Sequence, residues 1–222
     1  MEQVAPDLYL LDGFPQYGIN IYLMGDVLVD AGRQSDKRRI LRQLNGRSVS
    51  AHAITHAHAD HQGASHAVCD TLQIPLWCGE KDVAAMQSGD LSGQFPPPLG
   101  LIARLQLRFW AGPAHPVARP LHEGDKVAEF TVIETPGHAP GHISFWREAD
   151  RLLLLGDVLF NGDFLGRVGL QEPPDIFTVD PALNRKSARK VAQLNPEVIC
   201  FGHGPVLRNG RLFQQFITQL VK

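Results

Sequence analysis

The sequence predicts an α/β fold in which two mixed β-sheets pack face to face and helices cover their outer faces. Short apolar runs bounded by glycine alternate with helical patterns in both halves of the chain, and this alternation predicts two such layers. The chain has 222 residues, a hydrophobic fraction of 44% and a net charge of −2, all ordinary for a globular protein with a substantial core. We therefore expect one domain, residues 1–222, made of two pseudo-symmetric halves at about 1–116 and 117–222.

The first half is expected to open with three short strands and then to alternate helices and strands. Gly13, Gly18 and Gly25-Asp26 separate the three strands. Ser35 is a suitable N-cap for a helix that ends near Asn45-Gly46. The expected strands lie at 8–11, 19–23, 27–29, 51–55 and 74–77, and the later helices run through Ala64 and Val68 and from about 80 to 87.

Residues 88–116 interrupt this rhythm. They contain Pro96-Pro97-Pro98 between several glycines, followed by an apolar and aromatic run from Leu101 to Trp110. Two interpretations stay open: a surface loop with one connecting element, or a lid or pocket wall, since long irregular segments in compact enzymes often bind ligands.

The second half is expected to repeat the pattern of the first, with strands followed by helices. A proline at position 181 is expected to start a helix that runs to about Leu194. The expected strands lie at 117–119, 126–128, 129–133, 143–146, 151–155 and 197–201, and a last helix at 212–220.

The densest functional pattern is the segment His56-Ala57-His58-Ala59-Asp60-His61, which directly follows the apolar pair Ala53-Ile54. Side chains at 56 and 58 leave an extended segment on the same face, because strand side chains repeat every two residues. Asp60 and His61 fall where the chain should turn into a helix, so their side chains can return toward the same point. Nitrogen and oxygen donors that converge in this way bind a divalent cation such as zinc.

Three later apolar runs each end in one further candidate ligand on a glycine-containing turn. Phe130 to Ile133 leads to His138, Leu152 to Leu155 leads to Asp157, and Val198 to Phe201 leads to His203. The candidates are too many for one zinc ion and a natural number for two. The full set is His56, His58, Asp60, His61, His138, Asp157 and His203.

These four motifs, HxHxDH, PGH, GD and GHG, resemble in order and separation those of the metallo-β-lactamase-fold superfamily of hydrolases. The resemblance covers the whole chain and implies an αββα sandwich. It also implies that one metal ion takes His56, His58 and His138, that a second takes Asp60, His61 and His203, and that Asp157 bridges both. Zinc is the expected metal, although the same donors accept iron or manganese.

Two metal ions sharing a water molecule make it a nucleophile at neutral pH, because they bring its pKa toward about 7. The expected reaction is attack of the bridging hydroxide on a carbonyl, with Asp60 orienting the hydroxide. Residues 135–142 and 156–160 look most like glyoxalase II, the hydroxyacylglutathione hydrolases, and their shorter bacterial relatives. The prediction is a dinuclear hydrolase of a small thioester, ester or lactone.

Other members of the superfamily provide the alternatives. Asp157 stands where many zinc β-lactamases carry cysteine, which weakens β-lactam hydrolysis as the native role. Phe160 stands where acyl-homoserine lactonases usually carry tyrosine, which disfavours that activity. The chain also ends one helix beyond Gly202-His203-Gly204, without the helical domain that helps glyoxalase II hold glutathione. A persulfide dioxygenase of this fold would use one iron ion held by two histidines and an aspartate. A flavodi-iron reductase typically has glutamate where His58 stands, and an inactive binding module is disfavoured because every metal position is filled.

The composition gives no reason to expect nucleic acid or a membrane as a partner, and a small-molecule substrate is expected. A net charge of −2 gives no basic surface for nucleic acid, and no apolar stretch reaches membrane-spanning length. The start MEQVAPDLYL has no signal-like core, so a cytoplasmic protein is expected, and the sequence leaves its oligomeric state open. Cys69, Cys78 and Cys200 are expected to be reduced thiols in the core.

A few more polar residues stand near the motifs. Asp30 ends an apolar strand and could hydrogen-bond a ligand, and His142 is close enough to His138 to brace the site. Asp163 and Arg167 follow Asp157 beside the expected pocket mouth, where Arg167 could meet an anionic substrate or simply be solvated. Five histidines are expected to be structural or surface residues: His52, His66, His115, His122 and His142.

Overall fold

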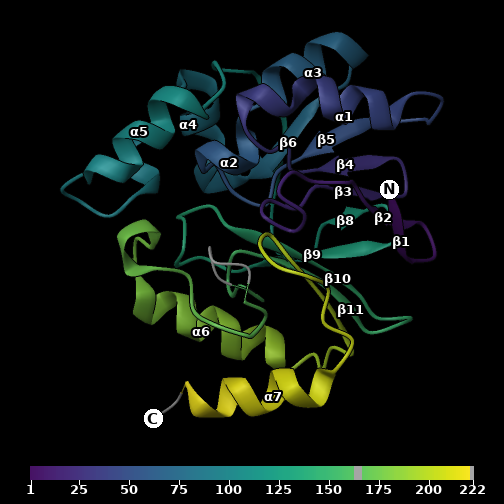
Figure 1. Ribbon diagram of the computed structural model, residues 1–222, viewed down its shortest axis with the longest axis vertical. Coiled ribbons are helices and arrows are strands. Elements are labelled where there is room, and N and C mark those ends of the chain that lie inside the picture. The colour runs from purple at the N-terminus through teal and green to yellow at the C-terminus, as the bar shows by residue number, and fades with distance from the viewer. Residues whose placement is uncertain (163–166, 221–222) are drawn as a thin grey trace.

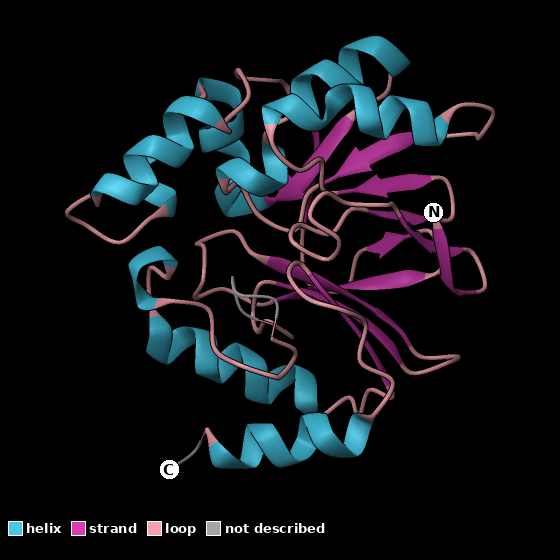
Figure 2. Cartoon of the chain, viewed as in Figure 1, coloured by secondary structure: helices cyan, strands magenta, loops and turns pink. Residues whose placement is uncertain are grey.

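Two β-sheets form the centre of the protein, with helices on both outer sides (Figures 1 and 2). The structure is a computed structural model that describes residues 1–162 and 167–220. Helices α1 to α5 lie on the side of the first sheet, and α6 and α7 lie on the side of the second. This is the predicted arrangement of two packed mixed sheets flanked by helices.

The first sheet has seven strands in sequence order. The first four strands pair antiparallel and the last four pair parallel, because helices connect the later strands. The strand at 117–121, which the sequence analysis placed in the second half, pairs with β6 and ends this sheet. The strands are β1 (Glu2–Ala5), β2 (Leu8–Leu10), β3 (Tyr22–Met24), β4 (Val27–Val29), β5 (Ala51–Ala53), β6 (Leu76–Gly79) and β7 (Val117–Leu121).

The second sheet has five strands in the order β12-β11-β10-β9-β8. Strands β8 to β11 are antiparallel neighbours, while β11 and β12 are parallel. The strands are β8 (Lys126–Val127), β9 (Phe130–Glu134), β10 (Ile143–Arg147), β11 (Leu152–Gly156) and β12 (Val198–Phe201).

The helices are short and lie close to where the sequence predicts them. Ser35 is not the N-cap of α1, because it lies in a 3-10 turn at Gln34–Asp36 and α1 begins after Asp36. Two more differences concern later helices. The helix expected through Ala64 and Val68 is two helices, α2 and α3, and the segment 88–116 contains α5, a helix of nine residues. The helices are α1 (Lys37–Leu44), α2 (Ala59–Gln62), α3 (Ser65–Leu72), α4 (Val83–Ser88), α5 (Leu101–Phe109), α6 (Pro181–Ala192) and α7 (Gly210–Gln219). None of them, within the described ranges, combines the length and apolar character needed to cross a bilayer.

The core consists of three apolar layers. One lies between the sheets and includes Tyr22, Phe130 and Phe145, and the other two lie between each sheet and its helices. Every residue of β10 and β11 is buried, and burial on both faces explains why β11 is a continuous apolar run instead of an alternating one.

All three cysteines are buried and free, as the sequence predicts. Burial raises the pKa of the Cys69 and Cys200 thiols to about 12 and raises the pKa of Cys78 as well.

Candidate metal centre

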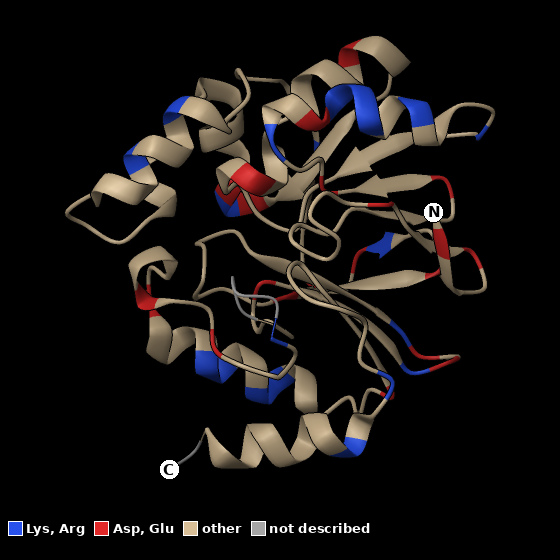
Figure 3. Ribbon diagram, viewed as in Figure 1, with Lys and Arg blue, Asp and Glu red and all other residues tan. Residues whose placement is uncertain are grey.

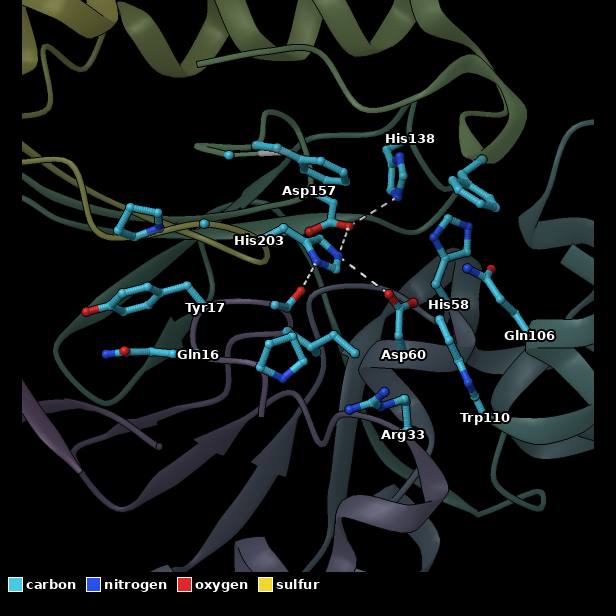
Figure 4. Close-up of a pocket in the computed structure, with 18 of the residues that line it drawn as sticks. Gln16, Tyr17, Arg33, His58, Asp60, Gln106, Trp110, His138, Asp157 and His203 are labelled. Carbon is cyan, nitrogen blue, oxygen red and sulfur yellow. Dashed lines mark hydrogen bonds and ion pairs between the residues drawn. The ribbon is translucent and has the colours of Figure 1, made fainter. Parts of the chain in front are cut away.

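The seven candidate ligands lie together at one end of the two sheets. The segment after β5 carries His56 and His58, and α2, which follows at once, carries Asp60 and His61. The turns after β9, β11 and β12 bring the remaining three, so four separate segments converge (Figure 4). The structure therefore brings together all of the predicted residues: His56, His58, Asp60, His61, His138, Asp157 and His203.

Their donor atoms fall into groups in which every atom lies within 4.8 Å of the others. One group is His56, His58 and His138, and another is Asp60, His61 and His203. These are the two ligand sets that the resemblance implies, and their occupation by metal remains a prediction.

Asp157 lies between the two groups and forms a third with His56 and His61. Its Oδ2 is 3.5 Å from His138 Nε2 in the first group and 3.2 Å from His203 Nε2 in the second. A carboxylate in this position can face a cation in each group.

Two buried atoms of the cluster have no hydrogen-bond partner within the protein: His138 Nε2 and Asp157 Oδ1. A buried polar group without a partner costs roughly 1–3 kcal/mol, so these atoms call for a ligand. In the first group, His56 Nε2 also lies only 3.0 Å from His58 Nδ1. Five imidazoles and two carboxylates form a donor set that suits zinc, iron or manganese, so the residues fit two divalent cations.

Burial lowers the pKa of His56 and of His138, and neighbouring histidines lower both further. Both imidazoles are therefore neutral at pH 7, which is the state that ligates a metal.

At the two carboxylates, burial and the neighbouring charges shift the pKa in opposite directions. Burial alone would raise the pKa of Asp157, but the charges of His203 and His61 outweigh burial and hold it well below its usual range. Burial is likewise outweighed at Asp60, whose pKa is lowered by His61 and His203. The same pairing raises the pKa of His203 to about 10, although burial opposes this.

Two residues that the sequence analysis named beside the ligands do support them. Asp30 Oδ2 lies 2.9 Å from His61 Nδ1, and its Oδ1 accepts a hydrogen bond from the Thr55 backbone N–H at 2.7 Å. His142 Nε2 accepts a hydrogen bond from the Asp157 backbone N–H at 3.0 Å. The buried Asp30 carboxylate thus orients one imidazole, and His142 holds the backbone that carries Asp157.

The sequence analysis missed Asp82, which is fully buried. Its Oδ2 accepts from the Ala57 N–H and its Oδ1 from the Gly141 N–H, both at 2.9 Å. Asp82 therefore ties the loop of His56 and His58 to the loop of His138. Burial raises its pKa to about 7, while the two backbone hydrogen bonds lower it. A signal existed, since Asp82 follows β6, the parallel neighbour of β5.

Other partners of the ligands are backbone carbonyls, which no residue type in the sequence reveals. His58 Nε2 lies 2.6 Å from the Gln94 carbonyl, and His203 Nδ1 donates to the Gly18 carbonyl. The partner of His138 is instead a side chain, with its Nδ1 3.2 Å from Thr178 Oγ1.

Gly202 shows how closely the turn after β12 approaches the ligands. A Cβ atom at this position would lie 1.9 Å from Asp157 Oδ1 and 2.9 Å from His61 Cε1. Only glycine allows this backbone to pass the cluster without displacing Asp157.

The predicted structural histidines lie outside the cluster. His52 is buried, with Nδ1 donating to the Leu28 carbonyl and Nε2 2.8 Å from Ser65 Oγ. His66 and His115 contact each other on the surface of the helical layer, and His122 is exposed.

A pocket of about 330 Å³ opens above the cluster. Its floor holds His58, Asp60, His138, Asp157 and His203, and Arg33 and Arg167 are among its lining residues. Asp163 lies outside the described residues. Gln106 and Trp110, the latter directly after α5, stand beside His58 (Figure 4), so the segment 88–116 does form a pocket wall.

Solved structures with the same fold support this architecture. The metallo-beta-lactamase family protein TTHA1429 from Thermus thermophilus superposes with a TM-score of 0.70 at 24% identity, covering 99% of this chain and 81% of that one. TTHA1623 in a di-iron-bound form has a TM-score of 0.65 at 28% identity, over 97% of this chain and 96% of that one. BLEG-1, a B3 metallo-beta-lactamase, has a TM-score of 0.69 at 28% identity, over 95% and 99%.

Proteins related in sequence include named metallo-hydrolases. The probable metallo-hydrolase YflN of Bacillus subtilis (strain 168) is 29% identical over 219 residues, which cover 87% of this chain and 80% of YflN. A hydroxyacylglutathione hydrolase of Methylobacterium nodulans is 39% identical over 114 residues, 49% of this chain and 42% of that protein. The Metallo-beta-lactamase superfamily matches residues 15–203, a span that includes every candidate ligand, and the chain therefore belongs to this superfamily.

Proposed function

We propose that the protein is a dinuclear metal-dependent hydrolase of a small thioester, ester or lactone, in which the single bond between the carbonyl carbon and the leaving sulfur or oxygen is cleaved. The observation that carries this proposal is the pair of donor groups at the floor of the pocket with Asp157 between them. Two divalent cations bound there would supply a Lewis acid for the carbonyl oxygen and an acidified water as the nucleophile.

The residues of the chain then have distinct tasks. Asp60 lines the pocket floor, with its Oδ2 3.4 Å from His203 Nε2, and is placed to orient the attacking water and accept its proton. Arg167 lines the pocket, where it can attract an anionic part of the substrate. The side chains at the floor are largely buried, which strengthens electrostatic interactions there.

A thioester is the favoured substrate class because the aligned hydroxyacylglutathione hydrolase acts, by its name, on such a bond. β-Lactam hydrolysis is the second candidate, and the similarity to BLEG-1 supports it. Zinc is the proposed metal, with iron as its competitor because TTHA1623 binds two iron ions. A mononuclear iron dioxygenase of this fold would keep the positions of Asp60, His61 and His203 as well, so metal content and oxygen consumption of the purified protein would separate it from a hydrolase. Three free buried thiols support a reducing compartment, the cytoplasm.

Elemental analysis of the purified protein, paired with a hydrolysis screen over S-lactoylglutathione, lactones, esters and nitrocefin, tests the proposal. We expect about two metal equivalents per chain and hydrolysis of at least one thioester, ester or lactone. His58→Ala should lose metal and activity, while His122→Ala, a matched change at an exposed histidine outside the cluster, should keep both. Full activity in His58→Ala, or undiminished activity after exhaustive chelation, would contradict the proposal.

A further inference from the structure

Exposed apolar side chains gather around the pocket. Val168 lines it, and Phe14 and Ile176 are the chain neighbours of the lining residues Pro15 and Phe177. Four more belong to α5, the helix next to the lining residue Trp110. Of the eight large hydrophobic residues that are exposed in the described part of the chain, seven lie on segments that line the pocket: Phe14, Leu101, Ile102, Leu105, Phe109, Val168 and Ile176.

Helix α5 turns an apolar row toward solvent. Leu101, Leu105 and Phe109 follow one another at four-residue intervals, so they share one face, and they are 73%, 47% and 63% exposed. A surface helix ordinarily turns its polar face outward, so this row indicates a face that is covered when the protein functions.

The row leads directly into the pocket. The neighbouring row on the same helix is Ile102, Gln106 and Trp110, and its last two members line the pocket wall beside His58 (Figure 4). The other apolar residues that line the pocket include Ile19, Phe160 and Phe177, beside the polar candidate ligands. An apolar path thus runs from the candidate metal centre past Trp110 to the outer face of α5.

We infer that the substrate carries an apolar acyl chain, which lies along this path while its carbonyl sits over the pocket floor. The inference rests on the proposed function and adds the chemical class of the acyl group. Burial of each methylene against these side chains favours longer chains over short ones.

Two features favour a chain over a second copy of the protein. The pocket is lined both from α5 and the residue after it, by Gln106 and Trp110, and from the segment before α6, by Phe177, and the ribbon places α5 across from that segment (Figure 1), as a bound chain requires. The charged residues of α5 are Arg104 and Arg108, with no acidic residue (Figure 3). Pairing α5 with its own copy would bring these arginines together without a countercharge on the helix.

A chain-length series tests the inference. Straight-chain acyl thioesters of one small thiol, from acetyl to dodecanoyl, would be assayed with the metal-loaded protein. We expect kcat/KM to rise roughly two- to fourfold for each added methylene until the chain passes the rim. Leu105→Ser and Phe109→Ser should each lower the decanoyl-to-acetyl ratio of kcat/KM roughly fivefold or more. The matched control is Leu212→Ser, which removes an exposed leucine on α7 and should leave this ratio unchanged.

The binding of dodecanoate and of butyrate can be measured by the change in tryptophan fluorescence, and this readout needs no turnover. Hydrolysis without any dependence on chain length would overturn the inference and leave the proposed function standing. Dodecanoate binding that weakens in Leu105→Ser, with no thioester, ester or lactone hydrolysed, would support the chain site and overturn the proposed function. Dissociation of a dimer by the two α5 variants, with an unchanged chain-length ratio, would assign the face to a second copy and overturn the inference.

Discussion

At the level of single residues, two buried carboxylates that are not candidate ligands organise the site. Asp30 holds the His61 imidazole, and Asp82 holds the backbone of two loops that carry the His56, His58 and His138 group. The candidate ligands were predictable because their residue types and spacing are chemically specific. For Asp82 the sequence offers only its position after β6, because its partners are backbone N–H groups that only the fold brings within reach.

Asp82→Asn should weaken the first ligand group while leaving the second. An asparagine side chain has one accepting oxygen, so its NH2 group would face the N–H of either Ala57 or Gly141. One of the two loops therefore loses its acceptor, at a cost of roughly 1–3 kcal/mol. We expect metal content after dialysis against a weak chelator to fall from two equivalents toward one. Asp70→Asn, at an exposed aspartate on α3, is the control. Two retained equivalents in Asp82→Asn would show that the carboxylate does not position these loops.

His52 should make stability fall in mild acid. Its pKa is lowered to about 4, chiefly by burial and in smaller part by His115, although the Leu28 carbonyl and Asp30 act in the opposite direction. In the unfolded chain, His52 has a pKa of about 6.5, so between about pH 6.5 and pH 4 it is protonated in the unfolded chain but neutral in the folded protein. Stability therefore falls as the pH drops from about 6.5 to about 4, by roughly 3 kcal/mol at most.

Urea unfolding at several pH values between 4.5 and 7.5 measures this effect. Other buried histidines also contribute, so the comparison is between the wild type and His52→Gln, which should lose less stability over the same range. His122→Gln, at an exposed histidine, should keep the wild-type slope. Equal slopes for wild type and His52→Gln would rule out this origin of the acid sensitivity.

At the level of elements, the site depends on how strand ends are joined to one another. The loop before β3 is tied to the turn after β12, because the Asn20 Nδ2 donates to the Phe201 carbonyl at 2.9 Å and to the Gly204 carbonyl at 2.7 Å. The Tyr22 hydroxyl donates to the same Phe201 carbonyl at 2.9 Å. These contacts hold the turn that carries His203 against a segment about 180 residues earlier in the chain.

Asn20→Ala should therefore destabilise the protein more than Tyr22→Phe. The first change leaves the buried Gly204 carbonyl without its side-chain donor, at a cost of roughly 1–3 kcal/mol, whereas Phe201 keeps the Asn20 donor in Tyr22→Phe. Midpoints of urea unfolding for the two variants would establish the order. The reverse order would mean that the tyrosine hydroxyl, not the asparagine, secures this turn.

Most elements could be predicted because apolar runs between glycines mark buried strands well. The strand β1 was missed because Glu2–Ala5 has only one fully buried side chain and no apolar run. The helix α5 was left open because its apolar face is directed outward, against the pattern that usually identifies a surface helix. The pairing of β7 with β6 depends on a parallel crossover that the local sequence does not encode.

At the level of the whole molecule, buried donors from distant segments link metal binding to folding. The unfolded chain does not assemble these donors, so a cation that binds the folded site stabilises it. At a free concentration of one hundred times Kd, the gain is about 2.7 kcal/mol per site. For a protein of this size, that corresponds to a rise in Tm of roughly 5–10 °C per site.

Chelation should therefore lower Tm as well as remove hydrolytic activity, and zinc added afterwards should restore both. Differential scanning calorimetry of the chelated and reloaded protein measures the change in Tm. The same chelator saturated beforehand with calcium serves as the control for direct effects of the chelator. An unchanged Tm across all three samples would speak against metal ions linking these segments.

The burial of all three cysteines makes the native protein unreactive toward thiol reagents, since thiolate is scarce and shielded at neutral pH. A colorimetric disulfide reagent should thus report opening of the fold directly, without an added probe. A cysteine introduced at position 105 would then be the one readily labelled thiol, and a fluorophore attached there could follow occupancy of the α5 face in real time.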